Sequence, residues 1–153
     1  MLQTVLKFST FSLALLLLFS CTLSAEQENR LNKQLSKYIK AHNEKNALEY
    51  AGLTHPLVVK YYSSLGDSSF IAHFSDQTGE NEVFFYDPLF REMKSDGNWI
   101  ERKYTVYKES GKERDKDYAL YAVSSDGGEN WFFLDEDDYF KQKIPLKRRL
   151  FSK

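Results

Sequence analysis

Apolar side chains in the first third of the chain recur at helical spacing. Between residues 26 and 50 they follow one another at intervals of three and four, which places them on one face of a helix. The pattern predicts a long helix and then a short one over residues 47–51, with Asn46 as its N-cap and Gly52 at its end. The predicted buried face holds Leu31, Leu35, Tyr38, Ile39 and His42, and the polar face holds Lys33, Lys37, Lys40 and Glu44.

The next stretch mixes turn signals with short apolar runs. Pro56 breaks helicity at Thr54-His55, because the residue before a proline is pushed towards extended geometry. Residues 57–62 are apolar without a clear period, so the pattern does not decide between helix and strand. After a turn at residues 66–68, apolar residues at helical spacing predict a third, short helix with Gly79 at its end. These apolar residues are Phe70, Ile71 and Phe74.

The pattern then changes to that of strands. Residues 83–90 are rich in aromatic side chains and predict a strand, in which Pro88 indicates an edge position or a bulge. Asp96-Gly97 predicts a hairpin turn that joins residues 90–94 to a strand over residues 99–107. Residues 109–117 alternate in charge sign and contain Gly111, so we expect a solvated loop or a long turn there.

The last two predicted strands, residues 118–123 and 131–134, flank a turn rich in glycine. Asp-Gly-Gly between two such runs predicts a tight hairpin, because glycine accepts the positive φ that these turns require. The same letters match the Asp-box pattern Ser-x-Asp-x-Gly-x-x-Trp, in which the aspartate accepts hydrogen bonds from turn N–H groups and the Trp packs beneath. This pattern predicts a structural turn and no chemistry. Its members are Ser124, Asp126, Gly128 and Trp131.

Helical segments followed by a strand-rich half predict one α+β domain over residues 26–140. The order resembles the NTF2-like superfamily (the SnoaL-like cone fold), in which N-terminal helices pack in a curved, mainly antiparallel sheet. The superfamily includes isomerases, dehydratases, polyketide cyclases and non-enzymatic binding or dimerisation domains, so the resemblance implies a fold and leaves the activity open. The resemblance is closest to small exported members and rests on Ala47-Leu48-Glu49-Tyr50, on Thr54-His55-Pro56-Leu57-Val58-Val59 and on the segment from Ser124 to Phe133.

The start of the chain has the features of an export signal. Residues 1–20 hold one charged side chain, Lys7, before an almost wholly apolar run, which is typical of a signal peptide. That run is too short for a membrane-spanning helix, which needs about 20 apolar residues. Leu18-Phe19-Ser20-Cys21 resembles a bacterial lipobox and implies lipidation of Cys21, whereas Ser24-Ala25 permits ordinary cleavage. Either ending predicts export, as a membrane-anchored lipoprotein or into the bacterial periplasm.

Composition and charge narrow the functional classes. The chain has 153 residues and a formal net charge of -1, so nothing attracts it to nucleic acid, and we expect no nucleic-acid partner. Cys21 is the single cysteine, so no disulfide forms within one chain. The three histidines lack the spacing of metal ligands, and we expect neither a metal nor a cofactor. The sequence contains no glycine-rich phosphate loop and no dinucleotide fingerprint.

The candidates for acid–base chemistry are few. In the cone fold that the chain resembles, His55 lies on the segment leading towards the pocket, where it would act as a general base with a carboxylate such as Asp87 or Glu92. We favour the alternative that His55 hydrogen-bonds to backbone at the helix break. We expect His42 to pack in the core and His73 to face solvent.

Two charged stretches follow the last predicted strand. We expect the acidic run at residues 135–138 to form a solvated turn, because it lacks the ligand spacing of a calcium loop. The basic tail, residues 141–153, contains no acidic residue. It suits contact with anionic lipid headgroups, pairing with the acidic run, or solubility alone.

These patterns lead to three hypotheses of function. The first is an exported, lipid-anchored domain that binds a small apolar ligand or a protein partner without catalysis. The second is a small isomerase- or cyclase-type enzyme with a His–carboxylate pocket, and the third is a homodimeric interaction module. The positions that we expect near a ligand are Tyr38, His55, Trp99 and Trp131.

Overall fold

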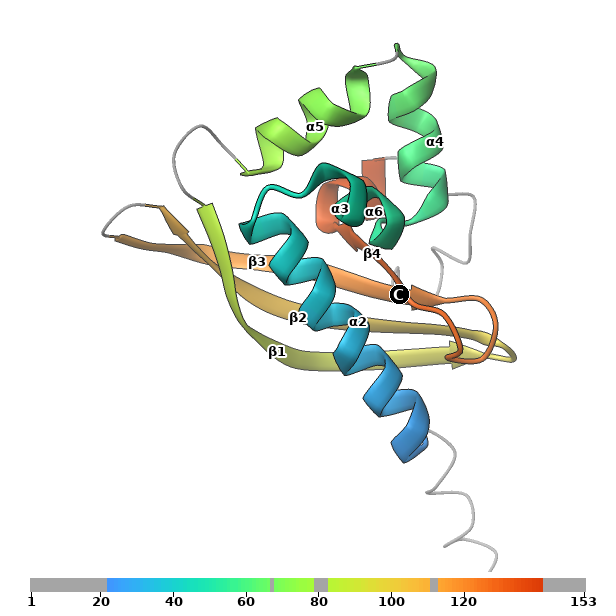
Figure 1. Ribbon diagram of the computed structural model, residues 1–153. Helices are drawn as coiled ribbons and strands as arrows, with labels where there is room; N and C mark the ends of the chain where they lie inside the picture. Colours follow the sequence, from blue (N-terminus) through green and yellow to red (C-terminus); the bar gives the residue numbers. More distant parts are fainter. Residues whose placement is uncertain (1–21, 67, 79–82, 111–112, 142–153) are drawn as a thin grey trace, which may run out of the picture.

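The protein is described by a computed structural model that covers residues 22–66, 68–78, 83–110 and 113–141. Helices come first and strands second, which confirms the predicted α+β class (Figure 1). Within the described residues, the helices that precede the strands are α2 (Ala25–Asn43), α3 (Ala47–Leu53), α4 (Pro56–Ser64) and α5 (Ser69–Thr78). The strands are β1 (Val83–Asp96), β2 (Trp99–Ser110), β3 (Glu113–Ser124) and β4 (Phe132–Asp135), and helix α6 (Glu136–Lys141) follows β4.

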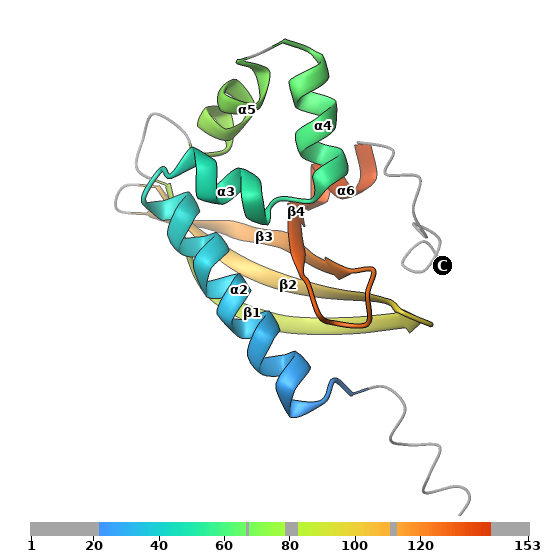
Figure 2. The ribbon, with the colours of Figure 1, turned by 45° about the vertical axis from the view of Figure 1, so that its right-hand side comes forward.

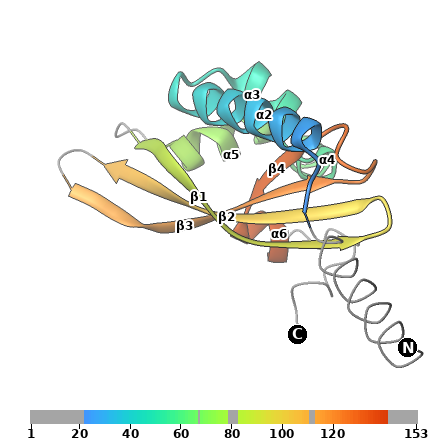
Figure 3. The same ribbon diagram turned by 90° about the horizontal axis from the view of Figure 1, so that it is seen from below.

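The strands form one antiparallel sheet in the order β1-β2-β3-β4. Helices α2 and α3 lie over one face of this sheet, and α6 lies on the other side (Figure 3). Successive side chains of a strand point to opposite faces, so the two faces build two separate cores. The helix side contains the larger one, which includes Leu31, Leu35, Tyr104, Leu120 and Phe133, and the α6 side contains Trp99, Tyr121, Val123, Leu134 and Tyr139.

The long helix α2 begins where its sequence provides a cap. Ser24 Oγ accepts the Gln27 N–H over 3.2 Å, and Gln27 Oε1 accepts the Ser24 N–H over 2.7 Å, which completes a capping box. The predicted apolar face is buried against the sheet, with Leu31 fully buried and Leu35 3 % exposed. The prediction of this helix from the 3–4 spacing is therefore confirmed.

The helices after α2 differ from the prediction in one detail. Asn46 caps α3 as predicted, by accepting the Glu49 N–H. The predicted end at Gly52 is wrong, because α3 continues to Leu53 and Thr54 is its C-cap. Thr54 Oγ1 donates to the Tyr50 carbonyl over 2.8 Å, which satisfies one of the carbonyl groups that a helix end leaves unpaired. The undecided run 57–62 is helical, within α4.

Strands β1, β2 and β3 are longer than predicted, and β4 has the predicted length. β1 is an edge strand with a register shift between Tyr86 and Leu89, so the edge and bulge indicated by Pro88 are both present. The predicted solvated loop at residues 109–117 is wrong, because β2 continues to Ser110 and β3 begins at Glu113. The register sets residue 109 opposite residue 114 and residue 108 opposite residue 115, positions of opposite charge. The alternating charges of this segment therefore lie on two paired strands and not in a loop.

Candidate functional site

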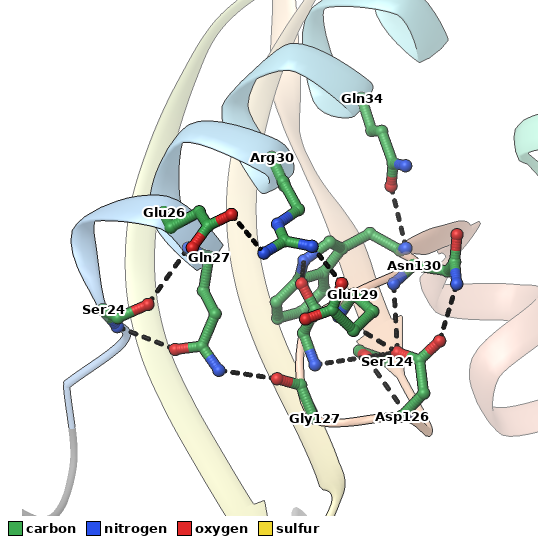
Figure 4. A network of polar contacts seen from close by, with 12 residues as sticks. Ser24, Glu26, Gln27, Arg30, Gln34, Ser124, Asp126, Gly127, Glu129 and Asn130 are labelled. Carbon is green, nitrogen blue, oxygen red and sulfur yellow. Dashed lines mark hydrogen bonds and ion pairs between the residues drawn. The ribbon is translucent and has the colours of Figure 1, made fainter.

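The Asp-box residues meet in the turn between β3 and β4 (Figure 4). Ser124 is fully buried; its Oγ donates to Asp126 Oδ1 over 2.8 Å and accepts the Gly128 N–H over 2.8 Å. Asp126 Oδ1 also accepts the N–H groups of Glu129 and Asn130, over 3.1 Å and 3.0 Å. Desolvation alone would raise the pKa of Asp126, but the hydrogen bonds to its carboxylate outweigh it and lower the pKa below the ordinary value.

Trp131 is used by the turn itself. Its ring is 1 % exposed, and Nε1 donates to the Gly128 carbonyl over 3.1 Å. Gly127 and Gly128 have φ angles of 76° and 90°, which L side chains rarely adopt. The turn therefore needs both glycines, and Trp131 is part of its support.

Three side chains of α2 contact this turn (Figure 4). Gln27 Nε2 donates to the Gly127 carbonyl over 2.6 Å, and Gln34 Oε1 accepts the Trp131 N–H over 2.8 Å. The third is Arg30, which pairs with Glu129. These contacts join positions about 100 residues apart, so no local sequence pattern indicates them. Together they hold the last hairpin onto the first helix.

His55 stands at the beginning of α4 and has a backbone role. Its Nδ1 accepts the Leu57 N–H over 3.3 Å, and its own N–H donates to the Phe133 carbonyl over 2.9 Å. Burial lowers the pKa of His55 to about 4, so the ring is neutral at pH 7. His55 thus acts as the N-cap of α4, which is the backbone role that we favoured over general-base chemistry.

The fold does not bring His55 and Asp87 together. Asp87 is part of the edge strand β1, and its side chain lies outside the described part of the structure. His55 follows Thr54, which pairs with Phe133 on the other edge of the sheet, beyond β4. Neighbouring strands lie about 4.8 Å apart, so the width of the four-stranded sheet separates the backbones of His55 and Asp87 by roughly 15–20 Å. Glu92, the other carboxylate considered, is exposed on β1.

Aromatic rings pack closely around Tyr38, between the helices and the sheet. Tyr38 Oη donates to Tyr50 Oη over 2.8 Å, and the two rings stack with their centroids 4.8 Å apart. The Phe133 ring lies 4.9 Å from Tyr38, and the Phe74 ring lies 4.5 Å from Tyr50. Burial raises the pKa of both tyrosines, so they remain neutral hydroxyl groups. His42 is also fully buried here, as predicted.

Trp99 lies on the opposite side of the sheet, where it binds a buried carboxylate. Its Nε1 donates to Glu101 Oε1 over 2.5 Å, and Tyr139 Oη donates to Glu101 Oε2 over 2.9 Å. Glu101 is 1 % exposed. Burial raises its pKa above the ordinary value, although the two hydrogen bonds and the charge of Lys94 act in the other direction. Neither local spacing nor composition distinguished Glu101 from the other acidic residues.

In the described part of the chain, a histidine–carboxylate pair joins His73 on α5 to Asp138 on α6. His73 Nε2 lies 3.1 Å from Asp138 Oδ2, and their side chains are 13 % and 6 % exposed. Tyr62 of α4 donates from its hydroxyl to Asp138 Oδ1 over 3.2 Å, and its ring stacks on His73 at 3.6 Å. The prediction that His73 faces solvent is therefore wrong. The pair was missed because its members lie 65 positions apart.

The acidic run 135–138 forms the end of β4 and the start of α6, so the prediction of a solvated turn is also wrong. Asp135 Oδ1 accepts the Asp138 N–H over 2.6 Å, which caps the helix, and Asp135 Oδ2 accepts the Tyr118 hydroxyl over 3.0 Å. Both aspartates are 4 % exposed. Buried carboxylates need such donors, because an unpaired buried charge is costly. The signal available in the sequence was an aspartate followed three positions later by another acid, at the start of a short helix.

Exposed apolar side chains gather where α4 meets α5. Tyr61, Leu65 and Ile71 are 45 %, 59 % and 50 % exposed, and we call these three residues the hairpin tip. The connection between α4 and α5 lies at the end of the molecule farthest from the start of α2 (Figures 1 and 2). Leu48, on α3, is the most exposed large apolar residue at 86 %, and stands apart from this set in the sequence.

Comparison with protein-family models, with curated proteins and with solved structures found no match. Several predictions concern residues outside the described ranges: the export signal at residues 1–20, lipidation of Cys21, and the tail from residue 142. Within the described ranges, none of the helices has both the length and the hydropathy to cross a bilayer. The same ranges hold no group of three His, Cys, Asp or Glu side chains placed for a metal ion.

Proposed function

We propose that the protein is an exported domain, anchored to a bacterial membrane through lipid on Cys21, that binds a protein partner without catalysis. The apolar run before Cys21 and the lipobox-like Leu18-Phe19-Ser20-Cys21 support the export and the anchor. We also propose that the fold is an NTF2-like cone. Its support is the order of elements, helices first and then an antiparallel sheet with helices over one face.

One observation carries the choice of a protein partner over a small ligand. The rings of Tyr38, Tyr50, Phe74 and Phe133 contact one another in the space where a cone would hold its ligand. Binding an apolar molecule there requires these rings to separate and to lose their packing. A partner on the outside of the domain requires no such change.

The anchor is tested by growing cells with a labelled fatty acid. Wild type should take up the label and sediment with membranes, and Cys21→Ala should do neither. Ser20→Ala, a small residue at the adjacent position, is the control and should behave as wild type. A wild-type chain that is exported without label would contradict the anchor and support cleavage near Ser24-Ala25.

The mode of binding is tested with an apolar fluorescent probe such as Nile red. We expect no saturable one-to-one binding by the folded protein. Saturable binding that weakens when Tyr50 is replaced by Ala, and not when the exposed Tyr61 is, would overturn the protein-partner proposal in favour of a small ligand.

A second candidate function is an acid–base enzyme, and the His73–Asp138 pair is the observation that favours it. A buried carboxylate that holds one ring nitrogen of a histidine is the usual way to orient a general base. If ketone or lactone substrates are turned over, His73→Gln should lower kcat by about 10²–10⁴-fold. Ser69→Ala, at the start of the same helix, is the control. Turnover that His73→Gln leaves unchanged would exclude this site.

A further inference from the structure

The hairpin tip is apolar, although its three side chains are exposed and do not fill the core of the domain. Among the residues of α4 and α5 whose burial the structure describes, the buried apolar side chains are Val58, Phe70 and Phe74, which are 0 %, 7 % and 4 % exposed. The three tip residues are each at least 45 % exposed, within two helical turns of the connection between the helices. Several exposed apolar residues that gather at one place mark an interaction site more often than a single one does.

The surroundings of the hairpin tip contain little charge. The sequence of residues 60–72 contains two charged residues of opposite sign, Lys60 and Asp67, and its other polar residues are serines and tyrosines. An acidic ligand, a nucleic acid or an anionic surface would find few partners there. The tip suits a surface that is itself apolar and uncharged.

The position of the tip in the molecule indicates which apolar surface it contacts. This inference rests on the proposed lipid anchor at Cys21. Cys21 stands four positions before Ala25, where α2 begins, and an extended chain of that length reaches at most about 14 Å. The capping box fixes Ser24 to α2, which shortens the flexible part further. The bilayer therefore stays near the start of α2, whereas the tip lies at the opposite end of the molecule (Figures 1 and 2). The tip therefore lies at the end of the domain that is distant from the proposed anchor.

Anchored copies on one membrane all carry the tip at a similar height. A two-fold axis perpendicular to the bilayer brings two such tips together while both anchors stay in place, and two-fold dimers are the commonest homo-oligomers. Confinement to a surface also raises the effective concentration of one copy around another. We propose that the hairpin tip is the contact between two copies of this chain, with Tyr61, Leu65 and Ile71 packing against the same residues of the second copy.

Cysteine cross-linking of the full-length protein in phospholipid vesicles tests this arrangement. Lipidation would occupy Cys21, so a single new thiol reports on one position. Ser64→Cys, exposed at the end of α4, should form a disulfide dimer at least about ten-fold faster than Ser36→Cys, exposed on α2. Equal rates at the two positions would overturn the proposal.

A second measurement uses sedimentation equilibrium of the full-length protein in detergent. Leu65→Glu should raise the dimer Kd at least about ten-fold, because each dimer would bury two new charges. Leu48→Glu is the matched control: it removes a more exposed leucine outside the tip and should leave the Kd unchanged. Both positions are exposed, so circular dichroism should show a native fold for each variant.

The outcomes separate this inference from the proposed function. A wild-type chain that is monomeric in detergent and in vesicles, or a dimer that survives Leu65→Glu, overturns the tip contact. A chain that takes up no fatty acid but loses its dimer with Leu65→Glu keeps the tip contact and refutes only the anchor.

Discussion

Gln27 Nε2 on α2 donates a 2.6 Å hydrogen bond to the carbonyl of Gly127, 100 positions further along the chain. The same side chain occupies the space beside Gly128, where an added β-carbon would lie 3.0 Å from Gln27 Cγ and 3.2 Å from Nε2. A β-carbon at residue 128 would therefore require the Gln27 side chain to shift by a few tenths of an ångström from its place beside the turn.

Gly128→Ala should destabilise the domain by about 1–3 kcal/mol, through the φ of 90° and the contact with Gln27. Urea unfolding measures the change. Gly52→Ala is the control: no atom lies within 4 Å of its added β-carbon, and it lies inside α3. That variant should stabilise the domain by about 0.5–1 kcal/mol. Equal effects at the two positions would show that the turn does not require glycine.

Asp126→Ala should destabilise the domain by about 1–3 kcal/mol, because the turn N–H groups lose their acceptor. It should leave the binding of any partner by the folded protein unchanged. The folded pKa lies below the ordinary value of 3.8, so this stabilisation is present above that pH and is lost as pH falls through the lower folded pKa. Ser125→Ala, exposed in the same turn, is the control; a comparable loss there would refute the specific role of Asp126.

His55 should make the domain less stable in mild acid. Its pKa is about 4 in the folded protein and 6.5 ordinarily, so below pH 6.5 the unfolded chain binds more protons. Stability is full above pH 6.5 and decreases as pH falls towards 4, by up to roughly 3 kcal/mol. His55→Asn keeps a capping oxygen and should lose less over this range, whereas His55→Ala should cost about 0.5–2 kcal/mol at pH 7. Parallel pH curves for wild type and His55→Asn would contradict the assignment.

Glu101 should act in the opposite direction. Its folded pKa is raised above 4.5, so its contribution to stability is fully present below pH 4.5 and is lost as pH rises through the folded pKa. Glu101→Gln cannot ionise, so the variant should gain stability relative to wild type as pH rises from 4 to 8. Thermal unfolding at several pH values measures this difference. A difference that does not change with pH would mean that Glu101 has an ordinary pKa.

Elements with a local signal were predictable. The 3–4 spacing and Asn46 predicted α2 and the start of α3, and Asp-Gly-Gly predicted the last hairpin, because all of these depend on neighbours in the sequence. The end of α3 was misplaced because Thr54, held by Tyr50, caps the helix rather than Gly52. The ends of β2 and β3 were read as loop because alternating charge is common to solvated turns and to paired strands.

The polar clusters were not predictable, because tertiary contacts assemble them. His73 and Asp138 belong to α5 and α6, and Glu101 meets Tyr139 across 38 positions. Each of these residues looks like an ordinary solvated residue in its own stretch of sequence. Helix α6 brings Tyr139 to Glu101 and Asp138 to His73, and these contacts form only in the folded domain.

The contacts of α2 with the last hairpin affect the order in which the chain folds. Gln27 and Gln34 obtain their partners from residues 127 and 131. A chain that crosses a membrane from its N-terminus therefore delivers the first helix long before the turn that holds it in place. Folding dominated by such distant contacts is slow. Under the proposed export, the domain would stay open during transport and close only after the last hairpin has crossed the membrane.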